Sequence, residues 1–506
     1  MKSECKNLIA FAAIVKLLVI ILLILSSLLP NYRADAFEPP EVSCTSKIDC
    51  LLRYTLDGFH KWDAIYFHFI AVNGYLLENT LAFFPLFPIF LRLISSLTYT
   101  LLPLWSFWTH SILVGVVLSF FCNLLCTVQM YRLSKLLLMS DSLSVVSALL
   151  FAINPASVFF TTLYSEALYS FLFLSALIWT YECKYVTGCL ILSMTVFCRS
   201  NGLVNCGFPC FFQFILLVNK LRSLYGKGRR GSAKHSPLPV SAATMAVFHR
   251  FLALLAIFLC MSSPYLIYQY YAGFLYCSTL PKPASLSFML PKKPGPELEE
   301  FANELGVLTP YSINSSFQPV WCAGVPWSSY MLLQKKFWDV GAFSYYRWRQ
   351  LPNFLLALPV LFLIFKIVSL FGRKTPKTIF SFGLLEDSRK HQLLVPHIYH
   401  ALFLSMYGII NVHIQVLTRM LFSSCPVLYW YCASVLLNEQ DNIFGRSHLR
   451  KAKTMESSMP RQLIGLFRLV NPLSYPPWSS QRTLLYYFYS YIVIGCLMHS
   501  NFLPWT

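Results

Sequence analysis

Hydrophobic positions in this chain are grouped into long uninterrupted blocks, which are separated by short polar segments. A helix needs roughly 17–25 apolar residues to cross the hydrocarbon core of a bilayer. Eleven stretches approach or reach that length: 8–29, 109–131, 143–159, 164–182, 185–200, 202–219, 250–273, 351–372, 393–411, 413–436 and 484–501. The pattern therefore predicts an all-α polytopic membrane protein with about eleven transmembrane helices.

The predicted spans divide the chain into five regions. The first apolar run is long and leucine-rich and lacks a small-residue cleavage site after it, which is typical of a signal anchor rather than a cleaved signal peptide. The regions are a signal-anchor span at 1–30, a first luminal loop at 31–108, a transmembrane core at 109–273, a large luminal loop at 274–350 and a C-terminal transmembrane region at 351–506.

Residues 81–104 are apolar enough to span the membrane, but they contain Pro85, Pro88, Arg92 and Pro103. Prolines in an apolar segment of this length favour a re-entrant or interfacial helix that stays on one side. We therefore expect 81–104 to remain within the first luminal loop.

Composition excludes a soluble protein. Hydrophobic residues make up 56% of the 506 positions and charged residues only 12%, whereas soluble domains carry about 25% charged residues. Disordered and collagen-like chains are excluded as well. The net charge of +19 would suit a nucleic-acid-binding protein if the basic residues formed one patch.

The basic residues are instead distributed as a topology signal. With the N-terminus in the cytosol, 24 Lys and Arg residues fall in cytosolic segments and 12 in luminal ones. This follows the positive-inside rule, so nucleic-acid binding is not expected. If 81–104 crossed the membrane, every later segment would change sides and the rule would fail.

Two further features agree with this topology. The only N-glycosylation sequon begins at Asn314, in the large luminal loop. Cys44, Cys50, Cys277 and Cys322 also fall on the luminal side, where disulfides form, and Cys44 and Cys50 are near enough in sequence to pair. No cysteine pair has zinc-site spacing in a loop, so we expect no metal site.

Ionisable residues near the luminal membrane face are candidates for chemistry, because burying them there is costly. Asp63 follows Trp62 in a run whose apolar positions 62, 65, 66, 69 and 70 recur at helical spacing. This spacing predicts an amphipathic helix on the membrane surface. Two interpretations of Asp63 stay open: an N-cap beside an interfacial aromatic, or a catalytic carboxylate.

Polar groups occur at three other luminal ends: Glu166, the turn Arg199-Ser-Asn201-Gly, and the pair Gln415 and Arg419. Arg199 could instead reach lipid headgroups, with Glu166 neutralising it. Two carboxylates and two arginines at one membrane face nevertheless suit a phosphate-bearing lipid and a sugar hydroxyl.

Motifs spread in order along the chain resemble the GPI mannosyltransferase 2 family, the enzymes that add the second mannose during glycosylphosphatidylinositol (GPI) anchor assembly. They are Trp62-Asp63-Ala64, Gly74-Tyr75, Ala82-Phe-Phe-Pro85, Asn154-Pro-Ala156, Tyr164-Ser-Glu-Ala167, Arg199-Ser-Asn-Gly202, Leu351-Pro-Asn-Phe-Leu355, His413-Ile-Gln-Val-Leu-Thr-Arg419 and Asn501-Phe-Leu-Pro-Trp-Thr506. The chain departs from the family at Lys61, where arginine is expected, and at Ile65, where a second acidic residue is expected.

The resemblance implies a GT-C type glycosyltransferase of the endoplasmic reticulum membrane. Such an enzyme would transfer mannose from dolichyl-phosphate-mannose to the GPI intermediate in the lumen, forming an α-1,6 bond with inversion and using no cofactor or metal. Some members act with a small membrane partner protein. The implied roles are Asp63 as catalytic base, Arg199 and Arg419 on the donor phosphate, Glu166 on sugar hydroxyls, and Trp62, Asn201 and Gln415 as further substrate-binding residues. Whether Asp57 assists Asp63 stays open.

Two other classes share parts of this pattern. A lipid or solute transporter or scramblase would have similar spans, but its polar groups would lie near the bilayer midplane. A membrane O-acyltransferase would need a buried histidine, for which His397, His400 and His413 are candidates.

Overall fold

The computed structural model describes residues 2–32, 36–40, 42–230, 240–277, 290–313, 318–323, 329–384, 389–440 and 463–505. All regular secondary structure in these ranges is helical. The predicted glycosylation site Asn314 lies outside the described residues, so its role stays a prediction. The division of the chain into five regions is likewise a prediction.

Long helices form the body of the molecule. They are α1 (Lys2–Ser26), α5 (Phe107–Leu138), α9 (Gly207–Arg230), α10 (Val240–Tyr276), α13 (Leu351–Lys374), α15 (Arg389–Asn411) and α21 (Ser480–Ser500). Among the described residues, six helical segments are long and apolar enough to cross a membrane: Glu4–Ser26, Phe107–Leu138, Ser200–Ser223, Ala243–Tyr276, Trp348–Lys374 and His391–Asn411. The protein is therefore a multi-pass, all-α membrane protein, as predicted.

The predicted number of eleven spans is not confirmed, because several apolar stretches form short helices. These are α6 (Asp141–Ala152), α7 (Glu166–Tyr181), α8 (Tyr185–Cys198), α16 (Leu417–Ser424) and α17 (Pro426–Leu436). The stretch 413–436, predicted as one span, is broken at Cys425, where Pro426 starts a new helix. Proline favours a first helical turn because it lacks the N–H that a helix interior requires.

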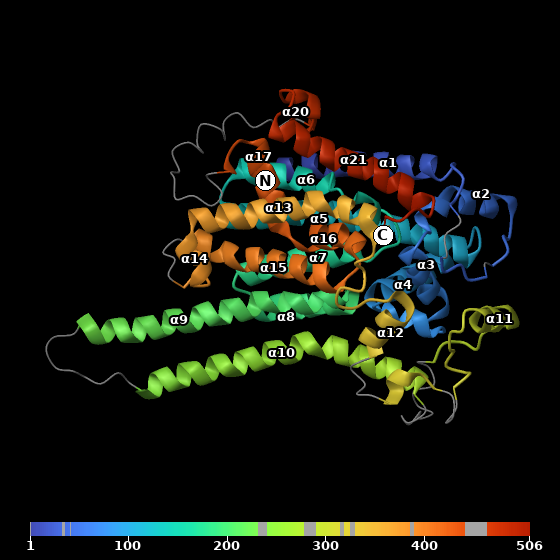
Figure 1. Ribbon diagram of the computed structural model, residues 1–506, viewed down its shortest axis with the longest axis horizontal. Helices are drawn as coiled ribbons and strands as arrows, with labels where there is room; N and C mark the ends of the chain where they lie inside the picture. Colours follow the sequence, from blue (N-terminus) through green and yellow to red (C-terminus); the bar gives the residue numbers. More distant parts are fainter. Residues whose placement is uncertain are drawn as a thin grey trace.

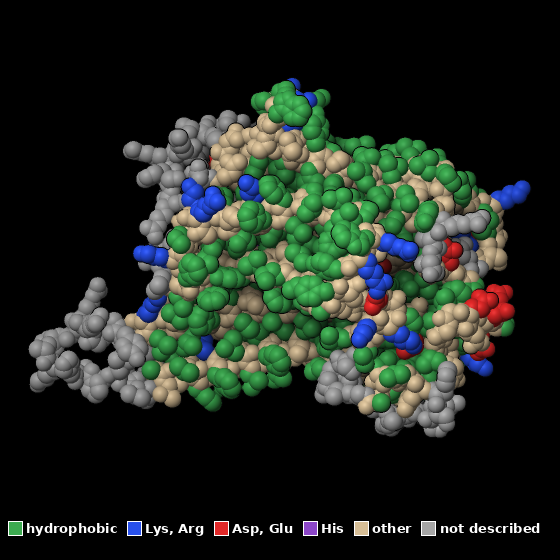
Figure 2. Space-filling view, viewed as in Figure 1, with side chains coloured by type: hydrophobic (Ala, Val, Ile, Leu, Met, Phe, Trp, Pro, Cys, Tyr) green, Lys and Arg blue, Asp and Glu red, His purple; other side chains and the backbone are tan. Residues whose placement is uncertain are grey.

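The long helices run side by side, and the predicted luminal segments gather at one end of the bundle (Figure 1). These segments are α2 (Lys47–Leu56), α3 (Asp63–Asn73), α4 (Leu86–Leu101), α11 (Pro296–Glu304) and α12 (Ser329–Trp338); the remaining short helices are α14 (Pro376–Phe380) and α20 (Leu463–Leu469). In Figure 2, hydrophobic side chains cover the middle of the visible face, whereas acidic ones lie toward the luminal end. An apolar belt between charged ends is the surface that a bilayer requires.

Helix α3 differs from its prediction. Its residues Ala64, Ile65, Phe67, His68, Phe69, Ile70 and Ala71 are all buried, so it is enclosed by protein rather than lying one-sided on the membrane. Helices α4 and α5 pack against it, and side chains such as Ala302 and Val307 of the second luminal loop join its hydrophobic cluster. The helix that begins with Asp63 therefore has a rigid support.

Helix α4 has 16 residues, about 24 Å at the usual rise per residue, which is short for the hydrocarbon core of roughly 30 Å. Its side relative to the membrane stays a prediction.

We expect cysteines substituted at Glu38, before α2, and at Thr100, near the end of α4, to react with an impermeant maleimide from the same side. Native Cys183, which is exposed and predicted to be cytosolic, is the matched control for the opposite side. Labelling of the two new cysteines from opposite sides would contradict the single luminal loop.

Two disulfides, Cys44–Cys50 and Cys277–Cys322, lie in the segments that were predicted to be luminal. Both join cysteines that the topology places in the oxidising compartment, which agrees with the predicted orientation. The pairing of Cys44 with Cys50 is confirmed.

Glu78 lies in the first predicted luminal loop and contacts residues of the second. Its side chain is fully buried and forms an ion pair with Lys336 of α12 at 2.7 Å. It also accepts a hydrogen bond from the indole N–H of Trp321 at 3.0 Å, and the Glu78 backbone N–H donates to the Leu308 carbonyl at 2.9 Å. A buried carboxylate needs such partners, because burying a charge without an ion pair or hydrogen bonds costs much free energy.

The two partners of this ion pair are expected to respond unequally to mutation. Lys336→Met leaves the buried Glu78 charge without its cation and should destabilise the protein by about 1–3 kcal/mol. Glu78→Gln removes the charge but keeps an acceptor for Trp321, and Lys336 is 47% exposed, so the cost should stay below about 1 kcal/mol. Thermal unfolding in detergent measures both. An equal or reversed order would contradict the assignment of Glu78 as the buried member.

Candidate active site

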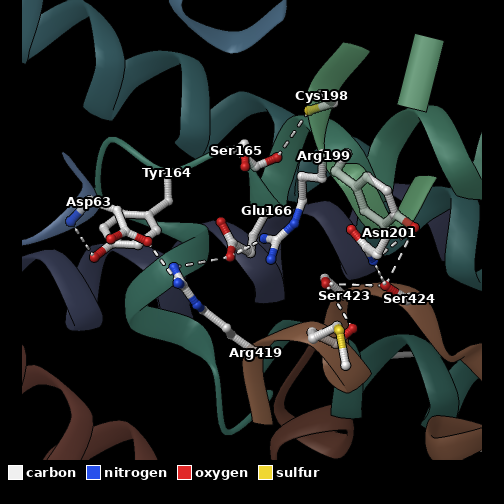
Figure 3. A network of polar contacts seen from close by, with 12 residues as sticks. Asp63, Tyr164, Ser165, Glu166, Cys198, Arg199, Asn201, Arg419, Ser423 and Ser424 are labelled. Atoms are coloured by element: carbon white, nitrogen blue, oxygen red, sulfur yellow. Dashed lines mark hydrogen bonds and ion pairs between the residues drawn. The ribbon is translucent and has the colours of Figure 1, made fainter. Parts of the chain in front are cut away.

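Four charged side chains from four separate elements meet near the end of the bundle that was predicted to be luminal (Figure 3). Asp63 is the first residue of α3, Glu166 is the first residue of α7, Arg199 caps the end of α8, and Arg419 lies in α16. All four were predicted as site residues, although they are far apart in sequence.

Arg419 is the centre of this charge network. Its Nη2 lies 2.7 Å from Asp63 Oδ2, and its Nη1 lies 3.5 Å from Glu166 Oε1. Arg199 Nη1 forms an ion pair with the same Glu166 oxygen. The charges thus alternate in the order Asp63, Arg419, Glu166, Arg199, so that each carboxylate contacts a guanidinium.

Burial separates the two carboxylates. The Glu166 side chain is 0% exposed and Arg419 8%, whereas Asp63 is 24% exposed and Arg199 14%. A buried charge is stable only when its partners stay in place, so Glu166 fixes the two arginines next to each other. Asp63 is the more exposed of the two carboxylates.

The backbone before Asp63 excludes the capping interpretation. Trp62 occupies the N-cap position of α3, and no side chain caps this end of the helix. The Asp63 carboxylate contacts Arg419 instead, while its backbone N–H donates to the Tyr164 hydroxyl at 3.3 Å. Trp62 has a φ of 55°, which is uncommon for a bulky residue and indicates local backbone strain.

Two aromatic rings flank Arg419, and residue pattern alone did not identify either as a site residue. The guanidinium carbon lies 5.2 Å from the centre of the Phe159 ring and 5.3 Å from that of Tyr164. Rings at this distance attract a cation and hold its plane. The position of Tyr164, two residues before Glu166 within a conspicuous motif, was the available signal for one of them.

The turn after α8 brings Arg199 toward Glu166. A 3-10 helix at Ser200–Cys206 follows Arg199, and Gly202 packs so tightly on α8 that a Cβ would lie 2.5 Å from the Thr195 backbone. Asn201 donates to the Ser424 hydroxyl at 3.0 Å and the Tyr169 hydroxyl at 3.3 Å. Asn201 therefore connects this turn to α7 and α16, and its predicted contact with substrate stays a prediction.

Two other predicted substrate-binding residues lie outside the ion-pair network. Gln415 belongs to the 3-10 turn Ile414–Val416 rather than to the helix of Arg419, and it accepts a hydrogen bond from Tyr345 at 3.0 Å. It lines a small cavity together with Phe159 and Thr418. Trp62 packs edge-on against Phe502, with ring centres 5.7 Å apart.

A buried histidine pair anchors the segment that precedes Asp63. His68 Nδ1 lies 2.9 Å from His60 Nε2, and His68 Nε2 lies 2.6 Å from the Ser111 hydroxyl of α5. Burial lowers the pKa of His68 to about 3 and that of His60 well below its usual value. Both rings are therefore neutral at physiological pH, and one can donate to the other.

The histidines of the acyltransferase alternative have structural partners. His397 Nε2 lies 2.7 Å from the Tyr181 hydroxyl, His400 Nε2 lies 3.1 Å from Asn205 Oδ1, and His413 stacks on Tyr345. Among the described residues, none of these three histidines contacts the ion-pair network.

Comparison with known proteins identifies the family. The family profile "Mannosyltransferase (PIG-V)" matches residues 5–506. The chain belongs to the PIG-V mannosyltransferase family. It is therefore an enzyme, and the transporter alternative is not supported.

Curated relatives of the PIG-V family cover nearly all of the chain. A "GPI alpha-1,6-mannosyltransferase 2" from Cricetulus griseus is 32% identical over 99% of this chain and 98% of its own. The protein of that name from Homo sapiens is also 32% identical, with the same coverage. A "GPI mannosyltransferase 2" from Drosophila melanogaster is 29% identical over 97% of both chains. Among solved structures, the archaeal oligosaccharyltransferase AglB from Archaeoglobus fulgidus is a distant neighbour, with a TM-score of 0.43 and 12% identity over 95% of this chain and 56% of its own.

Proposed function

We propose that this protein is a GT-C type enzyme that transfers the second mannose, through an α-1,6 bond, from dolichyl-phosphate-mannose to the GPI intermediate that carries one mannose. The reaction takes place at the luminal face of the endoplasmic reticulum membrane. The observation that carries this proposal is the network of Asp63, Arg419, Glu166 and Arg199 in a PIG-V family member. The activity for which the relatives are named supports the acceptor and the linkage.

The network contains the groups that an inverting displacement needs. The acceptor 6-hydroxyl attacks the anomeric carbon of a β-linked donor, so a base must take the hydroxyl proton while the leaving phosphate gains charge. Asp63 is the reachable carboxylate and acts as the base. Arg419 and Arg199 are the cations for the phosphate, because a guanidinium binds phosphate oxygens in a bidentate manner.

Arg419 keeps a donor available for this role. Its Nε makes no hydrogen bond to any part of the chain that the structure describes, while its two terminal nitrogens face Asp63 and Glu166. Glu166 lies between the guanidinium groups and reduces their mutual repulsion. The same carboxylate remains the candidate for holding sugar hydroxyls.

Several parts of the proposal rest on the family resemblance alone. A lipid-phosphate donor carries no nucleotide, so the proposed reaction needs neither a metal nor a cofactor. A small membrane partner protein, as in some family members, is proposed as well. Trp62, Asn201 and Gln415 complete the proposed substrate-binding set.

Reconstitution tests the proposed function. Purified protein in lipid nanodiscs, supplied with dolichyl-phosphate-mannose and a one-mannose GPI acceptor, should yield a two-mannose product that a linkage-specific α-1,6-mannosidase reverses. In cells lacking this step, expression should restore GPI-anchored proteins at the surface. Active protein that transfers mannose to a different acceptor, or no transfer with correctly folded protein, would contradict the proposal.

A further inference from the structure

The motif Asn501–Trp505, which has no part in the chemistry described above, lies against the residues just before Asp63. The ring of Phe502 is 4.4 Å from Lys61 Nζ and 5.7 Å from the ring of Trp62. Phe502 is 6% exposed. It shares a hydrophobic cluster with Ile65 and Phe69 of α3.

This contact falls on a strained part of the backbone. Trp62 and Phe502 have φ values of 55° and 56°, and a positive φ in a bulky residue is strained and persists only when the surrounding structure enforces it. The Trp62 indole N–H has no hydrogen-bond partner in the described ranges. Packing therefore holds the ring of Trp62, and Phe502 contributes the closest aromatic contact.

Two anchors hold the motif itself in place. On one side of Phe502, the Asn501 amide donates to the Ser26 carbonyl at 3.0 Å, and the Tyr32 N–H donates to the Asn501 carbonyl at 2.9 Å. On the other side, Trp505 lies on α21 at Gly495, where a Cβ would come within 2.7 Å of the indole nitrogen. Phe502 therefore lies between two residues, Asn501 and Trp505, that are each held in place by contacts with other parts of the chain.

Lys61 links Phe502 to the segment that precedes Asp63. Its ammonium pairs with Asp57 at 2.7 Å and its side chain is only 4% exposed, and the ring of Phe502 lies 4.4 Å from its ammonium nitrogen. The face of an aromatic ring attracts a cation electrostatically, most strongly where water is excluded. Lys61 and Trp62 are the two residues immediately before Asp63, the proposed base.

We propose that Phe502 is a positioning residue: it holds Lys61 and Trp62 in the conformation that directs the Asp63 carboxylate toward the acceptor hydroxyl. This inference rests on the proposed function of Asp63 as the base. It assigns to the Asn501–Trp505 motif a role in catalysis that requires no contact with substrate.

Phe502→Ala tests the proposal in the nanodisc assay. A misplacement of about 1 Å at the reacting groups can lower the rate by roughly 10²-fold, so we expect kcat to fall about 10- to 100-fold with the donor KM unchanged. Lys61 should become reactive toward an amine-directed reagent, detected by mass spectrometry. Phe502→Tyr keeps the ring and should retain near-parental kcat and a protected Lys61.

Phe11→Ala is the matched control for a general loss of packing. Phe11 is fully buried on α1 and packs on Phe467 with ring centres 4.6 Å apart, about 15 residues from the luminal end of that helix, or roughly 22 Å. It should lower thermal stability by a similar amount without changing kcat of the folded protein.

The outcomes separate this proposal from the proposed function. If the parental protein transfers mannose and Phe502→Ala keeps its kcat, or if Phe11→Ala lowers kcat equally, Phe502 is not a positioning residue. If Lys61 stays protected in Phe502→Ala, the proposed contact is refuted independently of any activity. If the parental protein itself transfers no mannose, the proposed function fails first, and Lys61 reactivity still decides whether Phe502 holds the loop.

Discussion

Asp63→Asn is expected to lose most mannose transfer while leaving the protein folded. Loss of general-base action alone typically lowers the rate by about 10²–10⁴-fold, which is roughly 3–5 kcal/mol of barrier. Asparagine has the size of aspartate and its carbonyl oxygen can still accept from Arg419, which also keeps Glu166 as a partner at 3.5 Å. The nanodisc assay measures the loss, and the one-mannose GPI intermediate should accumulate in cells.

Asp57→Asn is the control for this substitution. Asp57 pairs with Lys61 at 2.7 Å and is 41% exposed, and it lies outside the ion-pair network around Arg419. Because Asp57→Asn removes the anion beside the buried Lys61 ammonium, we expect it to lower thermal stability, while the folded protein retains most of its transfer activity. Near-parental transfer by Asp63→Asn together with a large loss in Asp57→Asn would move the base to Asp57 and overturn the assignment of Asp63.

Arg419→Lys should have the second-largest effect, although it preserves the charge. A lysine ammonium is a single point, whereas Arg419 contacts Asp63 and Glu166 through different nitrogens and is held between Phe159 and Tyr164. Lysine cannot reproduce this bridging geometry or bind a phosphate in a bidentate manner. Removing one preorganised donor to a developing negative charge lowers kcat by about 10²–10³-fold.

Arg92→Lys is the matched luminal control for Arg419→Lys. Arg92 donates to the backbone carbonyls of Ala71 and Val72 at 3.1 Å, contacts that an ammonium can also make, so activity should be retained. Comparable losses in both variants would indicate a structural role for arginine at this end rather than a role in the reaction. Unchanged kcat in Arg419→Lys would exclude Arg419 as the phosphate-binding cation.

Residue type and topology were enough to identify the charged site residues. Asp63, Glu166, Arg199 and Arg419 stood out because ionisable groups at a membrane face are costly unless they pair, and the predicted orientation placed all four at one end. The sequence did not indicate that Arg419 would bridge both carboxylates. That arrangement depends on the approach of α3, α7 and α16, whose contacts are distant in the chain.

The errors of the sequence prediction have physical causes. A uniform helical repeat through 413–436 placed Gln415 beside Arg419, but the backbone is 3-10 at Gln415 and breaks at Cys425. Helix α3 was expected to expose one face, because nothing in its own sequence shows that residues near 302 and 307 would cover it. Contacts such as that of Phe502 with Lys61 depend on packing between remote segments, which hydropathy does not report.

The four charged residues of the network are far apart in the chain, so they are synthesised at different times. Glu166 meets its first cation, Arg199, after only 33 further residues, so this carboxylate can be neutralised soon after both have entered the membrane region. Asp63 has to wait for Arg419, and translation at about 5–20 residues per second makes that interval roughly 20–70 s. During this time the charge network of the nascent chain is incomplete, and it forms only after α16, which carries Arg419, has been made. Membrane insertion factors that retain early helices at the translocon would therefore protect Asp63 until its cation arrives.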